Sequence, residues 1–240
     1  MILYHGSKMA DLKELKPQTA TFGEPLVYAT PEKEIAIIFT RKIGFNNIIA
    51  FGKNKDEKVY HIIELLPNAL KYMYNHKGYI YSFNSDDFYG KEKYPNANLN
   101  PFELASNKSV LIENVEILNS VYEKIIEMDK EGLIKIYHYP NRVEEQLPGL
   151  IDKTIYYYKE HNKPIKKDSF NDLLFYHQNL KEEINNRIEK KKISIPYISN
   201  NDIYNIFIKN KNNDLYENAL LILKEYNPQI YNMLNKIDKK

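Results

Sequence analysis

Three side chains that can bind or polarise a ligand stand beside short apolar runs of the chain. His5 follows the run that begins the sequence, Tyr28 lies within the run over residues 26–29, and Glu103 lies within the segment Phe102–Ser106. An imidazole can hold a hydroxyl group, a flat aromatic ring can stack on another ring, and a carboxylate can stabilise a developing positive charge. Strands that carry such side chains at their ends can form the floor of a ligand cleft.

The elements that must position these side chains are short. Apolar and β-branched runs predict strands over residues 1–7, 26–29, 58–66, 78–83 and 114–118. Residues 45–51 read as a further strand or as the start of a mobile loop. A helix is expected over residues 31–42, with Thr30 as its N-cap, Pro31 in its first position and Gly44 as its end. A further turn of helix is expected over residues 69–74. Residues 1–118 therefore read as a strand-rich domain.

The pattern becomes helical near residue 119. Ser120 and Glu123 form a capping-box pair, and Gly132 stands where a helix would end. Apolar residues at helical spacing predict a long helix from about Ser169 and another near residues 215–226, which Pro228 kinks or ends. We therefore expect an α+β fold in which a split β-sheet core with short helices (residues 1–118) is followed by an all-helical C-terminal domain (residues 119–240).

Composition narrows the classes of function. The 34 Lys and Arg residues nearly balance the 32 Asp and Glu residues, which argues against a strongly basic nucleic-acid surface. The chain has no cysteine, so it has no disulfides, thiolate nucleophiles or cysteine-type zinc sites. No metal-ligand spacing, phosphate-binding glycine loop or nucleophile elbow is present. With no apolar stretch of membrane-spanning length and no secretion signal, we expect a cytoplasmic protein that binds no metal and no membrane.

Three short motifs together carry a resemblance to a known family. They are Tyr4-His-Gly-Ser7, then Val27-Tyr-Ala-Thr30 with Ala36 and Phe39 in the following helix, and Glu103-Leu-Ala-Ser-Asn-Lys-Ser-Val110. In type and order they resemble the ADP-ribosyltransferase superfamily, in the branch with a His-Tyr-Glu signature that includes diphtheria toxin and the poly(ADP-ribose) polymerases. The resemblance covers about residues 1–118 and implies the split-sheet fold of that family.

The resemblance implies NAD as the substrate, transfer of its ADP-ribose to an unknown protein or nucleic-acid acceptor, and release of nicotinamide. It makes Glu103 the catalytic carboxylate, which would stabilise the oxocarbenium-like ribose of the transition state. His5 and Gly6 would hold a ribose hydroxyl and the nicotinamide amide, with Gly6 allowing close approach of the backbone. Tyr28, next to Ala29, would stack on nicotinamide, and Tyr81 could form a second stacking wall, although an inward core tyrosine explains it equally well.

The sequence also departs from the family's pattern. Members that modify arginine usually carry an acidic or amide residue two positions before the glutamate, where this chain has Pro101. If Glu103 is the catalytic glutamate, arginine is therefore a poor choice of acceptor. Glu113 and Glu116 lie on or near the last strand of this half and are rivals for the catalytic position.

Other readings stay open. The same fold with a decayed site would be a binding module, and an NAD-dependent RNA 2′-phosphotransferase or another nucleic-acid-modifying protein would share the motifs. Basic runs at residues 163–167, 190–192 and 239–240 could contact nucleic acid, but such runs are usually solvated. The helical half could cover the cleft, inhibit it or recruit a substrate.

Overall fold

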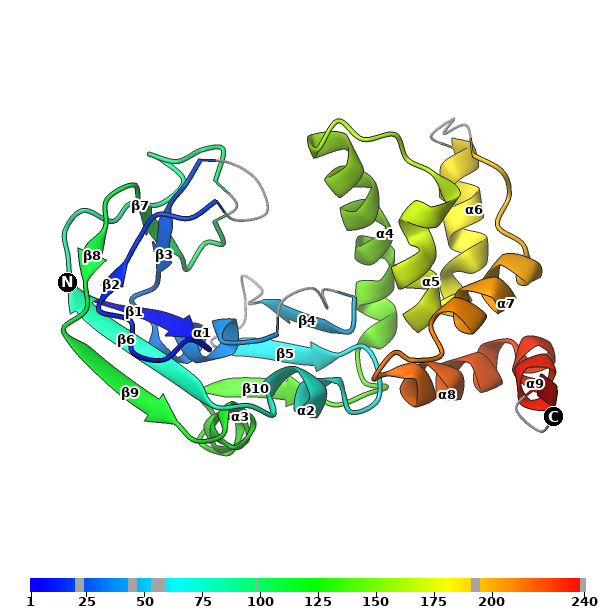
Figure 1. The fold of residues 1–240 in the computed structure, drawn as a ribbon, viewed down its shortest axis with the longest axis horizontal. Coiled ribbons are helices and arrows are strands. Elements are labelled where there is room, and N and C mark those ends of the chain that lie inside the picture. Colours follow the sequence, from blue (N-terminus) through cyan, green and yellow to red (C-terminus); the bar gives the residue numbers. More distant parts are fainter. Residues whose placement is uncertain (20–23, 43–46, 53–58, 98, 191–194, 238–240) are drawn as a thin grey trace. The chain divides into compact units, whose positions relative to one another are not determined.

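The computed structural model describes residues 1–19, 24–42, 47–52, 59–97, 99–190 and 195–237 of the chain (Figure 1). These residues combine helices with small β-sheets, as the mixed composition of predicted elements indicates. Among them, no helix has both the length and the apolar character needed to cross a lipid bilayer.

The first sheet carries the N-terminal strand. It has the order β1-β6-β9, with β1 at Ile2–Ser7, β6 at Gly78–Asn84 and β9 at Asn114–Leu118. Both neighbouring pairs are antiparallel, and the register places His5 opposite Tyr81. All three strands were expected from the sequence at nearly these bounds.

Two short ribbons adjoin this sheet. Strand β3 (Val27–Ala29) pairs with β7 (Leu104–Ser106), and β2 (Glu14–Leu15) pairs with β8 (Val110–Leu111). A single antiparallel bridge joins Tyr4 of β1 to Thr30, with hydrogen bonds of 2.8 and 3.0 Å in the two directions. The bridge fixes the end of β3 against the middle of β1.

Helix α1 (Lys33–Phe39) packs on strand β1 at Gly6. A Cβ atom added to Gly6 would lie 1.9 Å from the carbonyl oxygen of Ala36 and 2.9 Å from Thr40 Cγ2. The sequence suggests that Gly6 makes room for a ligand, whereas the structure shows that it makes room for the backbone of this helix.

The predicted start of this helix is wrong by two residues. The backbone of Thr30 is held extended by the bridge to Tyr4, so Thr30 and Pro31 cannot join the helix. The Thr30 hydroxyl instead accepts a hydrogen bond of 3.1 Å from the backbone N–H of Glu32. Regular helix ends at Phe39 and not at residue 42. The expected stop at Gly44 lies outside the described residues.

Another three-stranded sheet has the order β10-β5-β4, with β4 at Ile49–Gly52, β5 at Tyr60–Glu64 and β10 at Ile134–Tyr137. Helix α2 (Ala69–Tyr74) forms where one helical turn was expected. Residues 45 and 46, predicted to begin a strand, lie outside the part of the chain that is described. Strand β10 overturns the expectation that residues 119–240 are all-helical.

Helix α3 (Val121–Lys130) begins and ends as its sequence indicates. Ser120 accepts a hydrogen bond from the Glu123 N–H, and Gly132 has a positive φ of 73°. The N–H groups of Gly132 and Leu133 donate to the carbonyls of Asp129 and Met128, which is the hydrogen-bond pattern of a Schellman cap.

The remaining helices follow β10. They are α4 (Val143–Glu160), α5 (Asn171–Tyr176), α6 (Lys181–Lys190), α7 (Asn200–Lys209), α8 (Tyr216–Tyr226) and α9 (Pro228–Ile237), with 3₁₀ turns at Lys167–Phe170 and Gln178–Leu180. The long helix expected from Ser169 is therefore broken. The break lies at His177, whose ring bonds to the carbonyl oxygen of Asn47, so a tertiary contact overrides the helical pattern.

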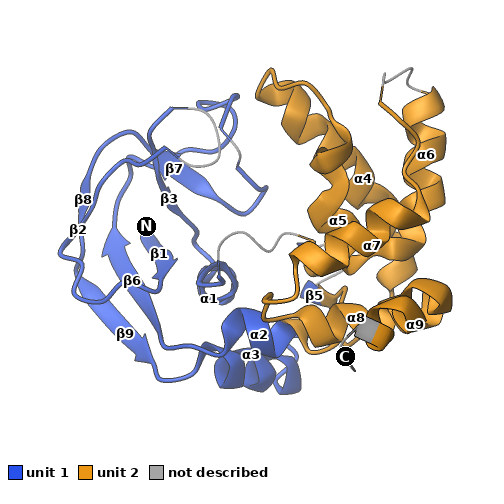
Figure 2. Cartoon of the chain, turned by 45° about the vertical axis from the view of Figure 1, so that its right-hand side comes forward, with its two compact units in different colours: residues 1–45, 51–62, 70–136 blue, residues 46–50, 63–69, 137–240 orange. Residues whose placement is uncertain are grey.

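The chain divides into two compact units (Figure 2). Unit 1 comprises residues 1–45, 51–62 and 70–136, and unit 2 comprises residues 46–50, 63–69 and 137–240. The boundary that the sequence suggests, between residues 118 and 119, falls inside unit 1, because α3 and most of β10 belong to that unit.

Candidate functional site

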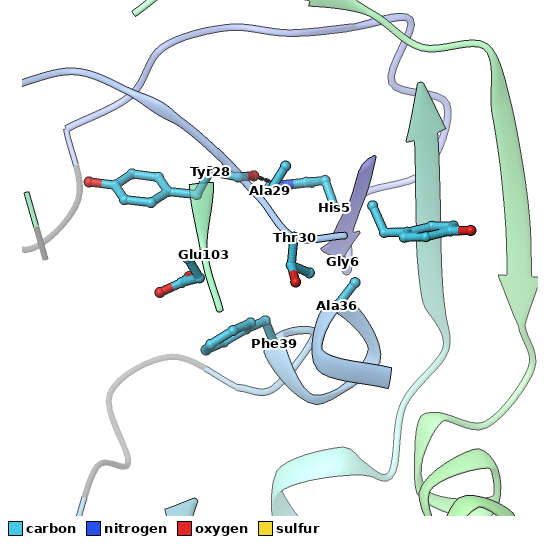
Figure 3. Close-up of a pocket in the computed structure, with 9 residues that line it drawn as sticks. His5, Gly6, Tyr28, Ala29, Thr30, Ala36, Phe39 and Glu103 are labelled. Atoms are coloured by element: carbon cyan, nitrogen blue, oxygen red, sulfur yellow. Dashed lines mark hydrogen bonds between the residues drawn. The ribbon is translucent and has the colours of Figure 1, made fainter. Parts of the chain in front are cut away.

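A cavity of about 160 Å³ lies in unit 1, where β1, β3, α1 and the residue before β7 meet. Figure 3 shows most of its lining side chains. The lining residues are Tyr4, His5, Gly6, Tyr28, Ala29, Thr30, Ala36, Phe39 and Glu103. Five of the six predicted site residues therefore lie around one cavity.

Strand pairing explains how residues so distant in sequence meet. The bridge between Tyr4 and Thr30 aligns the middle of β1 with the end of β3. In the β3–β7 pair, Ala29 stands opposite Leu104, so Glu103 comes one step beyond the last pair, level with Thr30. Strand pairing thus brings the histidine of β1, the tyrosine of β3 and the glutamate that precedes β7 close together.

The ring of His5 is held in one orientation. Its Nδ1 lies 2.8 Å from the carbonyl oxygen of Tyr28 (dashed line in Figure 3). A carbonyl oxygen can only accept, so Nδ1 carries a proton and donates it. Burial lowers the pKa of His5, and the bond to Tyr28 acts in the opposite direction. The ring is therefore neutral near pH 7, and its Nε2 is a hydrogen-bond acceptor with no partner among the residues that the structure describes.

Tyr28 contacts His5 through its backbone and not through its ring. In Figure 3 the ring extends to the same side as Glu103 and Phe39. The hydroxyl oxygen is enclosed and has no hydrogen-bond partner within the described part of the chain. Burial raises the pKa of Tyr28, and the negative charge of Glu103 raises it further. The ring thus offers an uncharged aromatic surface beside a carboxylate.

Glu103 combines a fixed position with an available oxygen atom. Its Oε2 accepts hydrogen bonds from the backbone N–H of Asn100 (2.9 Å) and from Asn100 Nδ2 (2.7 Å). Oε1 has no partner among the described residues. Burial raises the pKa of Glu103, while the two Asn100 bonds and the charge of Arg41 lower it. A carboxylate held this way can accept a hydroxyl hydrogen and stabilise nearby positive charge.

Arg41, two residues after Phe39, is a residue that the sequence reasoning missed. Its guanidinium lies 4.4 Å from the ring centroid of Phe51, a cation–π contact. Burial lowers the pKa of Arg41, and the charges of Tyr74 and Glu103 act against that shift. Arg41 makes no hydrogen bond and no ion pair with any described residue, Glu103 included. It is a half-buried cation with unused donors close to the cavity.

A signal for Arg41 is present in the composition. The chain holds three arginines, and the other basic residues are lysines. Arg142 pairs with Glu145, and Arg187 pairs with Asp152 and Glu183. Arg41 alone among the three has no carboxylate partner in the described structure. Arginine is well suited to bidentate binding of a phosphate or carboxylate, so its rarity here draws attention to each position.

Aromatic rings connect Arg41 to the cavity. Phe39 contacts Phe51 edge-on at 5.8 Å between centroids, Phe51 stacks on Tyr60 at 6.3 Å, and Tyr60 contacts Phe102 edge-on at 5.4 Å. Burial, followed by the charge of Glu103, raises the pKa of Tyr60 to about 12. These rings form an apolar support beneath one cation and one anion.

Tyr81 does not belong to the site. Its side chain is 1% exposed, and its hydroxyl donates a 2.7 Å hydrogen bond to the carbonyl of Met9. The ring stacks on Tyr79 and does not line the cavity. The proposed second stacking wall is therefore a core tyrosine that anchors the loop after β1.

The rival glutamates also lie elsewhere. Glu113 accepts hydrogen bonds of 3.0 and 2.8 Å from the backbone and side chain of Asn84. Glu116 forms an ion pair with Lys33. Neither lines the cavity, so Glu103 is the glutamate that meets His5 and Tyr28.

The size of the cavity limits what it can hold. A cavity of about 150 Å³ accommodates benzene, whereas pockets that enclose drug-sized ligands measure roughly 300–1,000 Å³. At about 160 Å³ this cavity fits one aromatic ring with a small substituent. A larger ligand would extend from it.

Neither a family model, nor a curated protein, nor a solved structure matches this chain. In the described ranges, no three His, Asp or Glu side chains are grouped so as to hold a metal ion.

Proposed function

We propose that the chain cleaves NAD between nicotinamide and ribose and transfers ADP-ribose to an acceptor. The observation that carries the proposal is the meeting of His5, Tyr28 and Glu103 around one cavity, in the order of elements that the resemblance implies. In the reaction, the bond between ribose C1′ and the nicotinamide nitrogen breaks, and nicotinamide leaves with the electron pair. The acceptor then bonds to C1′ and loses a proton.

The cavity volume supports nicotinamide as the buried group. Nicotinamide is a single aromatic ring with one amide substituent, which matches a space of about 160 Å³. The rings of Tyr28 and Phe39 provide aromatic surface on its walls. Neutral His5 has an acceptor at Nε2, so a ribose hydroxyl would donate to it.

The charges of the site suit the charge distribution of NAD. Glu103 would stand beside the nicotinamide riboside, where positive charge develops as the bond breaks. Arg41, with its unused donors, would take the negatively charged pyrophosphate. One anion and one cation that do not pair with each other thus correspond to the two charged parts of one substrate.

Nicotinamide release from NAD by the purified full-length chain tests the proposal. Glu103→Gln should abolish release while NAD binding stays within severalfold, because the carboxylate acts mainly in the transition state. Glu113→Gln is the matched control, since that glutamate lies outside the cavity, and it should retain release. Equal release by the wild type and Glu103→Gln would refute the assignment.

A second candidate is an NAD-binding module without turnover. The observation that favours it is the role of Glu103 in its own turn: Asn100 donates twice to the carboxylate, and the Glu103 N–H donates to the Asn100 carbonyl at 3.0 Å. A purely structural glutamate would make the same bonds. NAD binding with no nicotinamide release, in the presence of candidate protein and RNA acceptors, would select this alternative.

A further inference from the structure

A second cavity, of about 190 Å³, lies within unit 2 and has no part in the proposed reaction. Its apolar lining includes Leu147 and Ile222, which are 2% and 3% exposed. Its polar lining includes Tyr139, Glu144 and His177. The volume exceeds the roughly 150 Å³ that suffices for benzene, so a single ring with a short arm fits.

His177 gives the cavity a buried hydrogen-bond acceptor. The residue is 1% exposed, and its Nε2 lies 2.5 Å from the carbonyl oxygen of Asn47, so Nε2 carries the proton. Burial lowers the pKa of His177 to about 4. The ring is thus neutral at pH 7, and the lone pair of Nδ1 has no partner among the residues described. Because His177 lines the cavity, this lone pair is an acceptor for a ligand that carries a hydrogen-bond donor.

The other polar groups of the cavity favour a cation. Glu144 is exposed at the cavity, and its carboxylate forms no ion pair with a described residue. Tyr139 and Tyr226 line the same cavity. Burial is the main cause of the raised pKa of both tyrosines, and the negative charges of Glu225 and Glu144 raise it further. Both carboxylates are therefore close enough to act on the two tyrosines. Carboxylates and tyrosine rings together attract ammonium groups.

We propose that this cavity binds a small organic amine that carries an aromatic ring and a second hydrogen-bond donor. The donor bonds to Nδ1 of His177, the ring packs against Leu147 and Ile222, and the ammonium group lies between Glu144 and the rings of Tyr139 and Tyr226. The site is independent of the NAD reaction, and it would hold a free metabolite or effector of this class.

Tyramine is a suitable probe because it has a phenolic donor, one ring and an ammonium group on a short arm. Its binding to the full chain can be followed by titration calorimetry, with a millimolar dissociation constant expected for so small a ligand. Phenethylamine lacks the donor and should bind about tenfold more weakly. The neutral compound para-ethylphenol lacks the ammonium group and should also bind more weakly.

Variants and one spectroscopic readout locate the site. Glu144→Gln should weaken tyramine about three- to tenfold without affecting para-ethylphenol. Glu145→Gln is the matched control, because that side chain neighbours Glu144 but pairs with Arg142 and does not line the cavity. The ¹⁵N resonance of His177 Nδ1 should shift with tyramine and not with phenethylamine. Equal binding of the three compounds, equal effects of the two variants, or an unmoved His177 signal would each overturn the proposal.

Discussion

The packing of helix α1 on Gly6 makes Gly6→Ala the sharpest test of how the site is built. The new Cβ would lie 1.9 Å from Ala36 O, whereas real Cβ atoms stay at least 3.0 Å from other atoms, so the helix backbone must move by roughly 1 Å. Overpacking of this kind costs about 3 kcal/mol when backbone must shift. In a chain of this size the melting temperature should fall by about 6–12 °C.

The same substitution should impair the site. Ala36 and Phe39 line the cavity from α1, so displacing the helix moves two of its walls. We expect NAD binding to weaken together with thermal stability, measured by calorimetry and by circular dichroism during heating. Binding that weakens while the melting temperature is unchanged would refute the packing explanation and favour direct contact between Gly6 and the ligand.

Two glycine controls separate general crowding from the effect at the site. A Cβ at Gly78 would lie 2.5 Å from a methyl group of Val121, and Gly78 does not line the cavity. Gly78→Ala should lower stability without a direct effect on NAD binding. A Cβ at Gly149 in α4 would meet no atom within 4 Å. Gly149→Ala should stabilise the helix by about 0.5–1 kcal/mol.

Three further predictions follow from the charged groups of the site. Arg41→Gln should weaken NAD binding about tenfold and leave nicotinamide binding unchanged, because only NAD carries phosphates. Calorimetry that shows equal effects on the binding of both ligands would contradict the proposed contact between Arg41 and the pyrophosphate. Nicotinamide release should decline as the pH falls, because Glu103 must be ionised and His5 must be neutral. Burial raises the pKa of Glu103, so the decline should begin at a higher pH than for an ordinary glutamate. A kcat/KM profile that stays flat on the acid side would oppose these roles. Glu103→Gln should raise the free energy of unfolding at pH 7. A carboxyl whose folded pKa is raised contributes stability below about pH 4.5 and loses it as the pH rises through the folded pKa. In urea unfolding, a difference in free energy between the variant and the wild type that does not shrink at acid pH would count against this prediction.

The strands that carry His5 and Tyr28 could be predicted from the sequence because local signals define them. Short apolar runs end at His5 and surround Tyr28, and they predict strands. The acidic first turn of the helix that follows β3 indicates where that helix begins. Pairing of β3 with β7 then places Glu103, which precedes β7, beside the end of β3. The side of the sheet that Tyr81 faces was not accessible in this way, since alternation alone does not say which face is the core.

Other features depend on contacts that no local pattern reports. Strand β10 is four residues long and follows a helix, so its alternation is easily read as part of a helical region. The break at His177 comes from a hydrogen bond to Asn47, which is 130 residues away in the chain. Arg41 stands out only when it is known that its guanidinium lacks a partner in the described structure. Tertiary structure decides each of these.

Each of the two units is built from several separate stretches of the chain, which limits how the gene can be divided. Because unit 1 takes residues up to 136 and unit 2 takes residues 46–50 and 63–69, neither unit corresponds to one continuous stretch of coding sequence. A fragment ending at residue 118 would lose α3 and the strand β10 that pairs with β5. Any single cut through the chain therefore divides at least one of the two units, so we expect that neither unit can be obtained intact by dividing the gene in two.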